Sequence, residues 1–203
     1  MNLNGGKVVL REKRLEDAHD DYVWRSDPEL AKLDAAPPLR MSYEEFANYY
    51  KDELRFPVTW SRRFAITAVD GAHIGNCMYY DVDSVNRRAE LGIMIGDRAY
   101  WDHGYGFDAM VTMIDYIFSH TTLTHLYLHT LEWNLRARKA FQRCGLREVG
   151  PVRKNGYRFV RMELEREEWL KIRAEKLALR DKPSPLTHSS QTGPSMGPGA
   201  RSE

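Results

Sequence analysis

Residues 101–109 read WDHGYGFDA, and two glycines in this stretch, Gly104 and Gly106, precede the clearest amphipathic helix of the chain. Over residues 106–119 the apolar side chains recur at the three- and four-residue spacing of a helix with one buried face. Glycine lets an anionic ligand approach the backbone, and the free N–H groups at a helix N-terminus attract negative charge. The stretch therefore indicates either a phosphate-binding loop or a plain loop that starts a helix.

A dinucleotide-binding turn is one alternative, because residues 104–109 satisfy the pattern G-x-G-x-x-A and Glu132 follows at a distance suited to a ribose contact. The surrounding sequence argues against it. In a dinucleotide-binding fold the strand joins the first glycine almost directly, whereas here residues 96–103 separate Gly104 from the β-rich run that ends at Ile95. Hairpins, and not strand–helix–strand units, precede the motif.

The rest of the chain alternates β-rich runs with helical segments. A capping box at Ser42 and Glu45 begins one helix, and the pairs Asp70-Gly71 and Asn155-Gly156 are hairpin turn signals. The expected strands are residues 8–10, 64–69, 73–81, 88–95, 125–131, 146–152 and 158–164, and the expected helices are residues 16–25, 43–54, 106–119, 135–144 and 167–180. This order predicts a mixed α/β domain with a mostly antiparallel sheet, in which the strand–helix–strand unit 88–131 supplies one parallel pair.

Charge and composition exclude several classes of protein. Among 203 residues, 30 Lys and Arg nearly balance 29 Asp and Glu, whereas proteins that mainly bind nucleic acid carry a strong basic excess. No apolar run approaches the roughly 18 to 20 residues that cross a membrane, and residues 1–7 lack the apolar core of a signal peptide. The two cysteines, 67 positions apart, form no zinc or redox motif. We expect a cytoplasmic protein without a membrane partner and without nucleic acid as its main ligand.

Composition also divides the chain into two parts. Residues 182–203 contain four Pro, five Ser and three Gly, with Leu186 and Met196 as the only large apolar side chains. Such a stretch cannot bury enough apolar surface to offset the entropy of ordering. We expect one domain over residues 1–181 and a disordered Pro/Ser/Gly-rich tail over residues 182–203.

Several segments, taken in order, resemble the GNAT superfamily of acyl-CoA N-acetyltransferases, in its RimJ/RimL-like branch. The loop at residues 101–106 is similar to the superfamily's pyrophosphate loop, R/Q-x-x-G-x-G/A, in a Trp-led form. The other matching segments are VLR at 9–11, EDA at 16–18, AELGIMI at 89–95, Asn134, RCGL at 143–146 and REEW at 166–169. The resemblance implies the GNAT fold, of α+β type: a central mixed, mostly antiparallel sheet of six to seven strands with one splayed parallel pair, flanked by helices.

The resemblance also implies acetyl-CoA as the acyl donor and assigns its contacts. The backbone of Met94 and Ile95 matches the part of the family that binds the pantetheine arm, and Asn134 matches a side chain that contacts the cofactor where two parallel strands separate. The positions that match the pyrophosphate cradle are His103, Gly104, Tyr105 and Gly106.

Four cations follow Asn134 within eight positions: Arg136, Arg138, Lys139 and Arg143. Such a cluster attracts the phosphates of coenzyme A. We take Arg138 as the candidate nucleotide contact, with Arg143 as the alternative, and a solvated helix face explains the remaining cations equally well.

Glu90 is the candidate catalytic base, because it lies 14 residues before Gly104, where some protein-acetylating members of the superfamily carry a glutamate base. The reaction requires a group that takes the proton of the attacking amine. The alternatives are that Glu90 only orders a water molecule or that it pairs with Arg62, Arg63 or Arg88.

The general acid is not evident from the sequence. Many family members carry a tyrosine seven residues after the asparagine, and Phe141 occupies that position here. Water could protonate the leaving thiolate instead, or one of four side chains, Tyr79, Tyr80, His129 and Tyr157, although strand Tyr and His residues most often have structural roles.

Metal and thiol chemistry find little support. His125 and His129 share one face of an expected strand, but at about 3.3 Å per residue their Cα atoms lie roughly 13 Å apart, too far for one ion. Cys144 stands at a helix end without a histidine partner, which is typical of a small core residue. We expect no metal.

The acceptor is expected to be a primary amine: a peptide N-terminus, a polyamine or an amino sugar. Residues 34–60 should line its cleft, and their acidic and aromatic side chains suit a cationic acceptor, although an ordinary exposed helix is the alternative; the side chains are Glu44, Glu45, Tyr49, Tyr50, Asp52 and Glu53. We predict an N-acetyltransferase that works by direct attack of the amine in a ternary complex. The second hypothesis, favoured by Phe141, is a non-catalytic acyl-CoA-binding or partner-binding domain. We leave a homodimer open.

Overall fold

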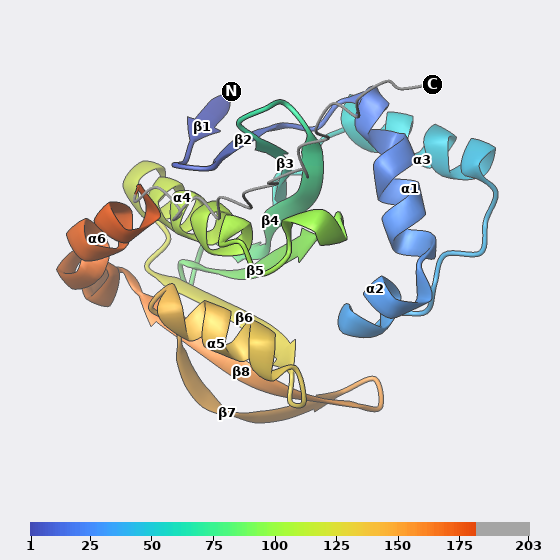
Figure 1. The fold of residues 1–203 in the computed structure, drawn as a ribbon. Helices are drawn as coiled ribbons and strands as arrows, with labels where there is room; N and C mark the ends of the chain where they lie inside the picture. Colours follow the sequence, from blue (N-terminus) through green and yellow to red (C-terminus); the bar gives the residue numbers. More distant parts are fainter. Residues whose placement is uncertain (182–203) are drawn as a thin grey trace, which may run out of the picture.

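An open sheet of eight strands, in the order β1-β2-β3-β4-β5-β6-β8-β7, forms the centre of the computed structural model, which describes residues 1–181 (Figure 1). The strands are β1 (Asn2–Asn4), β2 (Val8–Glu12), β3 (Arg62–Ala68), β4 (His73–Asp83), β5 (Arg88–Ile95), β6 (His125–Leu131), β7 (Arg147–Lys154) and β8 (Tyr157–Glu165). The sheet confirms the expected mixed α/β class. The tail predicted over residues 182–203 lies outside the described residues.

Within residues 1–181, six α-helices flank the sheet, and they divide between its two faces. The helices are α1 (Ala18–Ser26), α2 (Pro28–Leu33), α3 (Tyr43–Arg55), α4 (Tyr105–His120), α5 (Leu135–Arg143) and α6 (Arg166–Arg180), with short 3-10 turns η1 (Leu15–Asp17) and η2 (Arg98–Tyr100). Helix α4 packs against the sheet and contacts α5 and α6, whereas α1, α2 and α3 group together on the other side (Figure 1). None of the helices within residues 1–181 is long and apolar enough to cross a membrane.

The two faces of β5 differ because successive side chains of a strand point in opposite directions. Ala89 and Leu91 are buried in the main core with α4, which contributes Met110 and Ile114 among its fully buried side chains. Glu90 and the following even-numbered residues therefore face the side that carries α1, α2 and α3.

Every strand pair in the sheet is antiparallel except β5 with β6. These two strands pair in parallel over three residue pairs, the last of which is Glu90 with Tyr127. Strand β5 continues to Ile95 and β6 to Leu131, so the strands separate beyond Glu90. This confirms the splayed parallel pair.

Strand β1 makes the sheet one strand larger than the six to seven strands expected. Asn2–Asn4 has little intrinsic β-propensity, and it is a strand because it pairs with β2 after the turn in which Gly5 N–H donates to the Val8 carbonyl. The Asp27-Pro28 pair ends α1 as expected. Asp27 then caps α2, a helix that was not expected, and its first residue is Pro28.

Candidate active site

The separation of β5 and β6 defines the candidate site, and Glu90 lies at the last paired position. Glu90 as a whole residue is only 5% exposed to solvent. Oε1 of Glu90 lies 2.9 Å from Nδ1 of His129, which is two residues beyond Tyr127 on β6. The arginines considered as alternative partners bind elsewhere: Arg62 pairs with Glu12, Arg63 with Glu53 and Arg88 with Asp83. The partner of Glu90 is therefore an imidazole.

Two tyrosines flank this pair from the neighbouring strands. Tyr80 on β4 is directly opposite Glu90, and Tyr127 is opposite it on β6. Burial and the charge of Glu90 raise the pKa of Tyr80 and of Tyr127 above the usual value, so both phenols stay protonated at neutral pH. The guanidinium of Arg161 stacks over the Tyr127 ring at 4.1 Å from its centroid.

Beyond Glu90, the end of β5 meets a pocket that reaches α2. The pocket is lined by Trp24, Arg25, Leu30, Ala31, Asp34, Ala36, Pro37, Leu39 and Met94. Asp34 lies at the solvent-accessible rim, where partial desolvation raises its pKa. Helix α2 also approaches the end of β6, since the ammonium of Lys32 lies 5.6 Å from the centroid of the Trp133 ring.

The glycine loop follows β5 and is tied to it by Trp101. The indole Nε1 of Trp101 donates to the Ile95 carbonyl at 2.7 Å. Gly104 has a φ of 83°, a left-handed conformation that favours glycine, and serves as the N-cap of α4. At Gly106, an added Cβ would meet only the Ile95 side chain, at 3.7 Å.

The loop is suited to a diphosphate. Helix α4 is 16 residues long, and the N–H groups of its first turn lack helical partners. Nζ of Lys7 donates to the His103 carbonyl at 2.8 Å, which places an ammonium beside the loop. Two guanidinium groups of α5 also face it: Arg136 stacks on Trp101 at 4.2 Å and Arg143 on Phe107 at 4.3 Å from the ring centroids.

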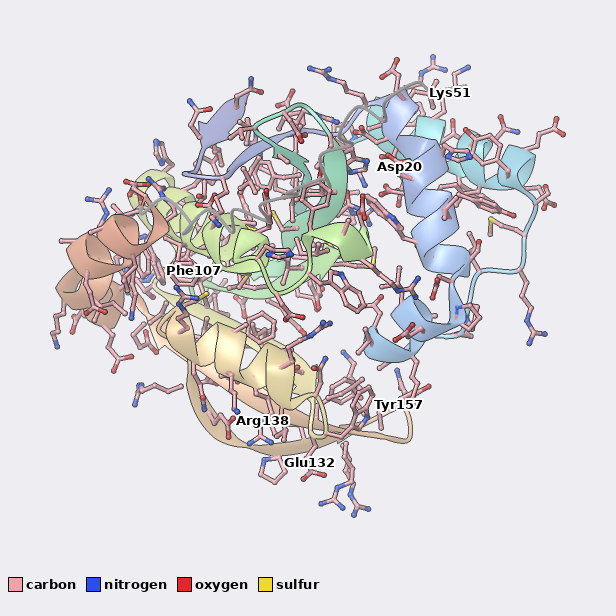
Figure 2. All side chains as sticks on the ribbon, viewed as in Figure 1. Asp20, Lys51, Phe107, Glu132, Arg138 and Tyr157 are labelled. Carbon is pink, nitrogen blue, oxygen red and sulfur yellow. The ribbon has the colours of Figure 1, made fainter. Side chains whose placement is uncertain are left out.

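Arg138 and Asn134 have structural partners. Arg138 makes two hydrogen bonds of 2.8 Å to the Glu148 carboxylate and one of 3.0 Å to the Glu132 carbonyl, on the side of α5 that faces β7 (Figure 2). The Asn134 side-chain oxygen accepts from Ala137 N–H and caps α5. The cofactor contacts of these two residues stay predictions.

The structure separates the four alternatives for the general acid. Tyr79 is buried in the main core with α4, away from Glu90. Tyr157 is at the turn between β7 and β8 and is 40% exposed (Figure 2). Phe141 packs against the main core. Tyr80 and His129 are the two alternatives on the face of Glu90.

Several of the acidic and aromatic side chains of α3 have structural roles. Glu45 forms the expected capping box with Ser42, and Glu53 pairs with Arg63. Tyr50 is buried against α1. Within residues 34–60, Asp34 is the acidic side chain that lines the pocket beside Met94.

Three features of the site were not foreseen. His129 was considered as a general acid and as a metal ligand but not as the partner of Glu90, the indole of Trp101 was read only as part of a motif, and Asp108 was not considered. Asp108 in the first turn of α4 accepts hydrogen bonds from the backbone N–H groups of Gly6, Lys7 and Val8, and so anchors the turn before β2 to the loop. An acidic residue in the first turn of a helix was the available signal.

The side chains considered for metal binding and thiol chemistry have structural partners or lie in the core. His125 pairs with Glu165 and His129 with Glu90, and within residues 1–181 no three His, Cys, Asp or Glu side chains are grouped as metal ligands. Cys144 is 1% exposed, and burial raises the pKa of its thiol to about 12. Cys144 is a core residue, as expected.

Comparison with known proteins identifies the family. The family model of the acetyltransferase (GNAT) domain matches residues 7–147. An uncharacterized N-acetyltransferase p20 from Bacillus licheniformis is 29% identical over 121 residues, which are 59% of this chain and 67% of that protein. The chain therefore belongs to the GNAT family, and it is an acyl-CoA-dependent N-acetyltransferase.

Solved structures share the fold. Spermidine N-acetyltransferase from Vibrio cholerae, in complex with CoA and spermine, is similar with a TM-score of 0.72 at 20% identity, over 81% of this chain and 98% of that chain. Aminoglycoside acetyltransferase AAC(6')-Ib, in complex with coenzyme A, is similar with a TM-score of 0.69 at 16% identity, over 82% and 99%.

Proposed function

We propose that residues 1–181 form a RimJ/RimL-like acetyltransferase domain that moves the acetyl group of acetyl-CoA to a cationic primary amine. The observation that carries this proposal is the buried Glu90–His129 pair, which lies where β5 and β6 separate and on the chain just before the glycine loop. The thioester would lie at this separation. The amine would attack it directly within a ternary complex.

The loop and its cations support acetyl-CoA as the donor. Gly104 and Gly106 leave the backbone accessible at the N-terminus of α4, and Lys7, Arg136 and Arg143 bring positive charge to the same end. Phosphates are stabilised by such a combination of N–H groups and cations. The backbone at Met94 and Ile95 does not pair with β6, and it would hold the pantetheine arm.

A cationic acceptor is supported by the charges on the open side of the sheet. Asp34 lines the pocket beside Met94, and the carboxylates of Asp81 and Glu90 act on the neighbouring tyrosines. The ring of Tyr80 adds a face on which an ammonium group can rest, whereas the guanidinium of Arg161 already stacks over the Tyr127 ring. Two of the similar structures belong to enzymes named for a polyamine and for aminoglycosides, and we propose an acceptor of one of these kinds, with a peptide N-terminus as the third class to test.

Glu90 is proposed to draw off the proton of the attacking amine. Its low exposure and its hydrogen bond to His129 hold the carboxylate in place. A preorganised carboxylate near the attacking nitrogen contributes typically 10²- to 10⁴-fold to the rate of such a transfer.

The test is release of coenzyme A thiol, measured with a chromogenic disulfide, across spermidine, spermine, kanamycin and an unblocked tetrapeptide. Acetyl-CoA is expected to raise the melting temperature, and at least one amine should give sustained thiol release. If acetyl-CoA raises the melting temperature but no amine gives thiol, the non-catalytic acyl-CoA-binding function, favoured by Phe141 in place of the usual tyrosine, replaces the proposal.

A further inference from the structure

We infer that His129 is the residue that exchanges protons with both substrates, and that Glu90 acts through it. This inference rests on the proposed function and changes the part each residue plays in it. His129 takes the proton of the amine and then returns a proton to the departing thiolate. Glu90 is a positioning residue that orients the imidazole and stabilises its charged form.

The first step of the argument is the orientation of the His129 ring. Nδ1 of His129 lies 2.9 Å from Oε1 of Glu90. Because an ionised carboxylate only accepts hydrogen bonds, this contact places a hydrogen on Nδ1 and leaves the lone pair of the neutral ring on Nε2. Among residues 1–181, no side chain or backbone group is hydrogen-bonded to Nε2.

The second step is accessibility. The side chain of Glu90 is 7% exposed, whereas that of His129 is 14% exposed. His129 is two residues beyond the last residue of β6 that pairs with β5, and it therefore lies where the strands have separated. A substrate nitrogen in this opening reaches the imidazole more readily than the carboxylate behind it.

The third step concerns the charged and titratable groups around the ring. Tyr80 and Asp81 on β4, Arg88 on β5, Tyr127 on β6, Arg161 on β8 and Asp34 after α2 surround Glu90 and its two tyrosines. Tyr127 lies edge-on to the His129 ring at 5.7 Å and Phe159 at 6.3 Å between centroids. Glu90 is the charged group in direct contact with the imidazole, and the other charges act on the two tyrosines beside it.

The proton balance explains why Phe141 is tolerated. The acceptor enters as an ammonium ion and loses one proton to solvent before it attacks. As the C–N bond forms, the nitrogen becomes positive again and gives its second proton to Nε2 of His129. As the C–S bond breaks, the imidazolium gives this proton to the thiolate. Amide, free thiol and one released proton result, and no separate tyrosine is required.

The test replaces His129 with asparagine, which keeps an N–H donor close to the position of Nδ1 but has no basic nitrogen. We expect His129→Asn to lower kcat at least 100-fold with spermidine, kanamycin or the tetrapeptide, while the acetyl-CoA dissociation constant changes less than twofold. His125→Asn is the matched control. His125 lies on the same strand and the same face, and its Nδ1 is 2.5 Å from Glu165, but it is at a position where β5 and β6 still pair. This control should keep kcat within twofold.

Two further readouts distinguish proton transfer by His129, here called the relay, from a purely structural role of this residue. The residual rate of His129→Asn should rise with hydroxide concentration without a plateau, and Glu90→Gln combined with His129→Asn should be no slower than His129→Asn alone, because the two residues act as a unit. A His129→Asn enzyme within threefold of the parent in kcat/KM overturns the inference. So do independent, multiplicative losses in the double variant.

A measurement that needs no acceptor keeps the inference separate from the proposed function. In nitrogen-15 spectra of the full chain, the neutral His129 ring should carry its hydrogen on Nδ1, and Glu90→Gln should reduce the population of this tautomer. A ring protonated on Nε2 overturns the relay even in an active enzyme. Failure of every amine to release thiol overturns the proposed function. The tautomer measurement does not depend on an acceptor, so it still tests the orientation of the His129 ring.

Discussion

The indole of Trp101 donates a 2.7 Å hydrogen bond to the carbonyl oxygen of Ile95, and this bond links the glycine loop to the end of β5. One residue thus joins the two segments proposed to hold the pyrophosphate and the pantetheine arm. Its ring also carries the guanidinium of Arg136 on one face, at 4.2 Å. The position of Trp101 therefore affects the loop, the strand and a cation together.

We expect Trp101→Phe to weaken acetyl-CoA binding about fivefold, because a partly buried hydrogen bond of this kind contributes about 1 kcal/mol. Isothermal titration calorimetry with acetyl-CoA measures the effect. Trp60→Phe is the control, because Trp60 is 59% exposed and lies beside the end of β4. Equal affinities of the Trp101 variant and the parent enzyme would contradict the linking role.

Gly106→Ala should separate ligand binding from folding. An alanine Cβ there meets only Ile95, at an ordinary contact distance, and alanine is favoured over glycine inside a helix by up to about 1 kcal/mol. The variant should be at least as stable as the parent but bind coenzyme A at least tenfold more weakly, since the methyl group occupies the path of the phosphates. Thermal melts and calorimetry measure the two effects, and Gly150→Ala, with open space around its Cβ, is the control.

The α5 cations should differ in their effect on the cofactor. Arg136 faces the loop, whereas Arg138 is held by Glu148. We expect Arg136→Met to weaken coenzyme A binding several-fold at low salt, and the loss should shrink as the salt concentration rises. Arg138→Met should mainly lower the melting temperature. A larger loss of affinity in the Arg138 variant would support the direct nucleotide contact predicted for that residue.

Asp17 should make the stability of the protein depend on acid pH. Burial by itself raises the pKa of Asp17, but hydrogen bonds from Arg11, at 2.6 and 2.8 Å, and from the Arg14 N–H outweigh it, and the pKa lies below its usual value. The contribution of the pair to stability is therefore complete above the pKa of the unfolded chain and is lost as pH falls through the folded pKa.

Asp17→Asn should lower the free energy of unfolding at pH 7 by about 3 kcal/mol, because it leaves Arg11 without its carboxylate. The difference from the parent should shrink as the pH is lowered below 4, roughly the unfolded pKa of Asp. Urea titrations between pH 7 and pH 3 measure it, with the exposed Asp52→Asn as the control. A difference that stays constant over this range would show that the pair does not titrate.

Local signals in the sequence were enough for much of the fold. The helix expected over residues 106–119 is α4, because its apolar spacing reports one buried face. The hairpin expected at Asn155-Gly156 is also present, since both residues have positive φ, as a two-residue turn requires. The elements that were missed, β1 and α2, are short and depend on their neighbours.

The contacts of the site depend on packing across distant segments and were harder to foresee. Glu90 and His129 are 39 positions apart, and they meet because of the register of the one parallel strand pair. In the same way, the sequence did not reveal that Glu148 on β7 pairs with Arg138, whose nucleotide contact stays a prediction. Residue types suggested the candidate chemistry of the site, but the register of the strands decided which candidate residues lie together.

The three residue pairs between β5 and β6 are the only ladder joining strands β1–β5 to strands β6, β8 and β7 within residues 1–181. Helix α4 contacts β1, β2, β4 and β5 on one side of this junction and α5 and α6 on the other. Helix α4 therefore spans the junction and, with the core that both parts of the sheet share, supports the opening from behind. Phe107 and Arg143 are in contact where α4 meets α5. Substitutions there should therefore alter substrate access to the opening between β5 and β6, although both residues lie behind the sheet.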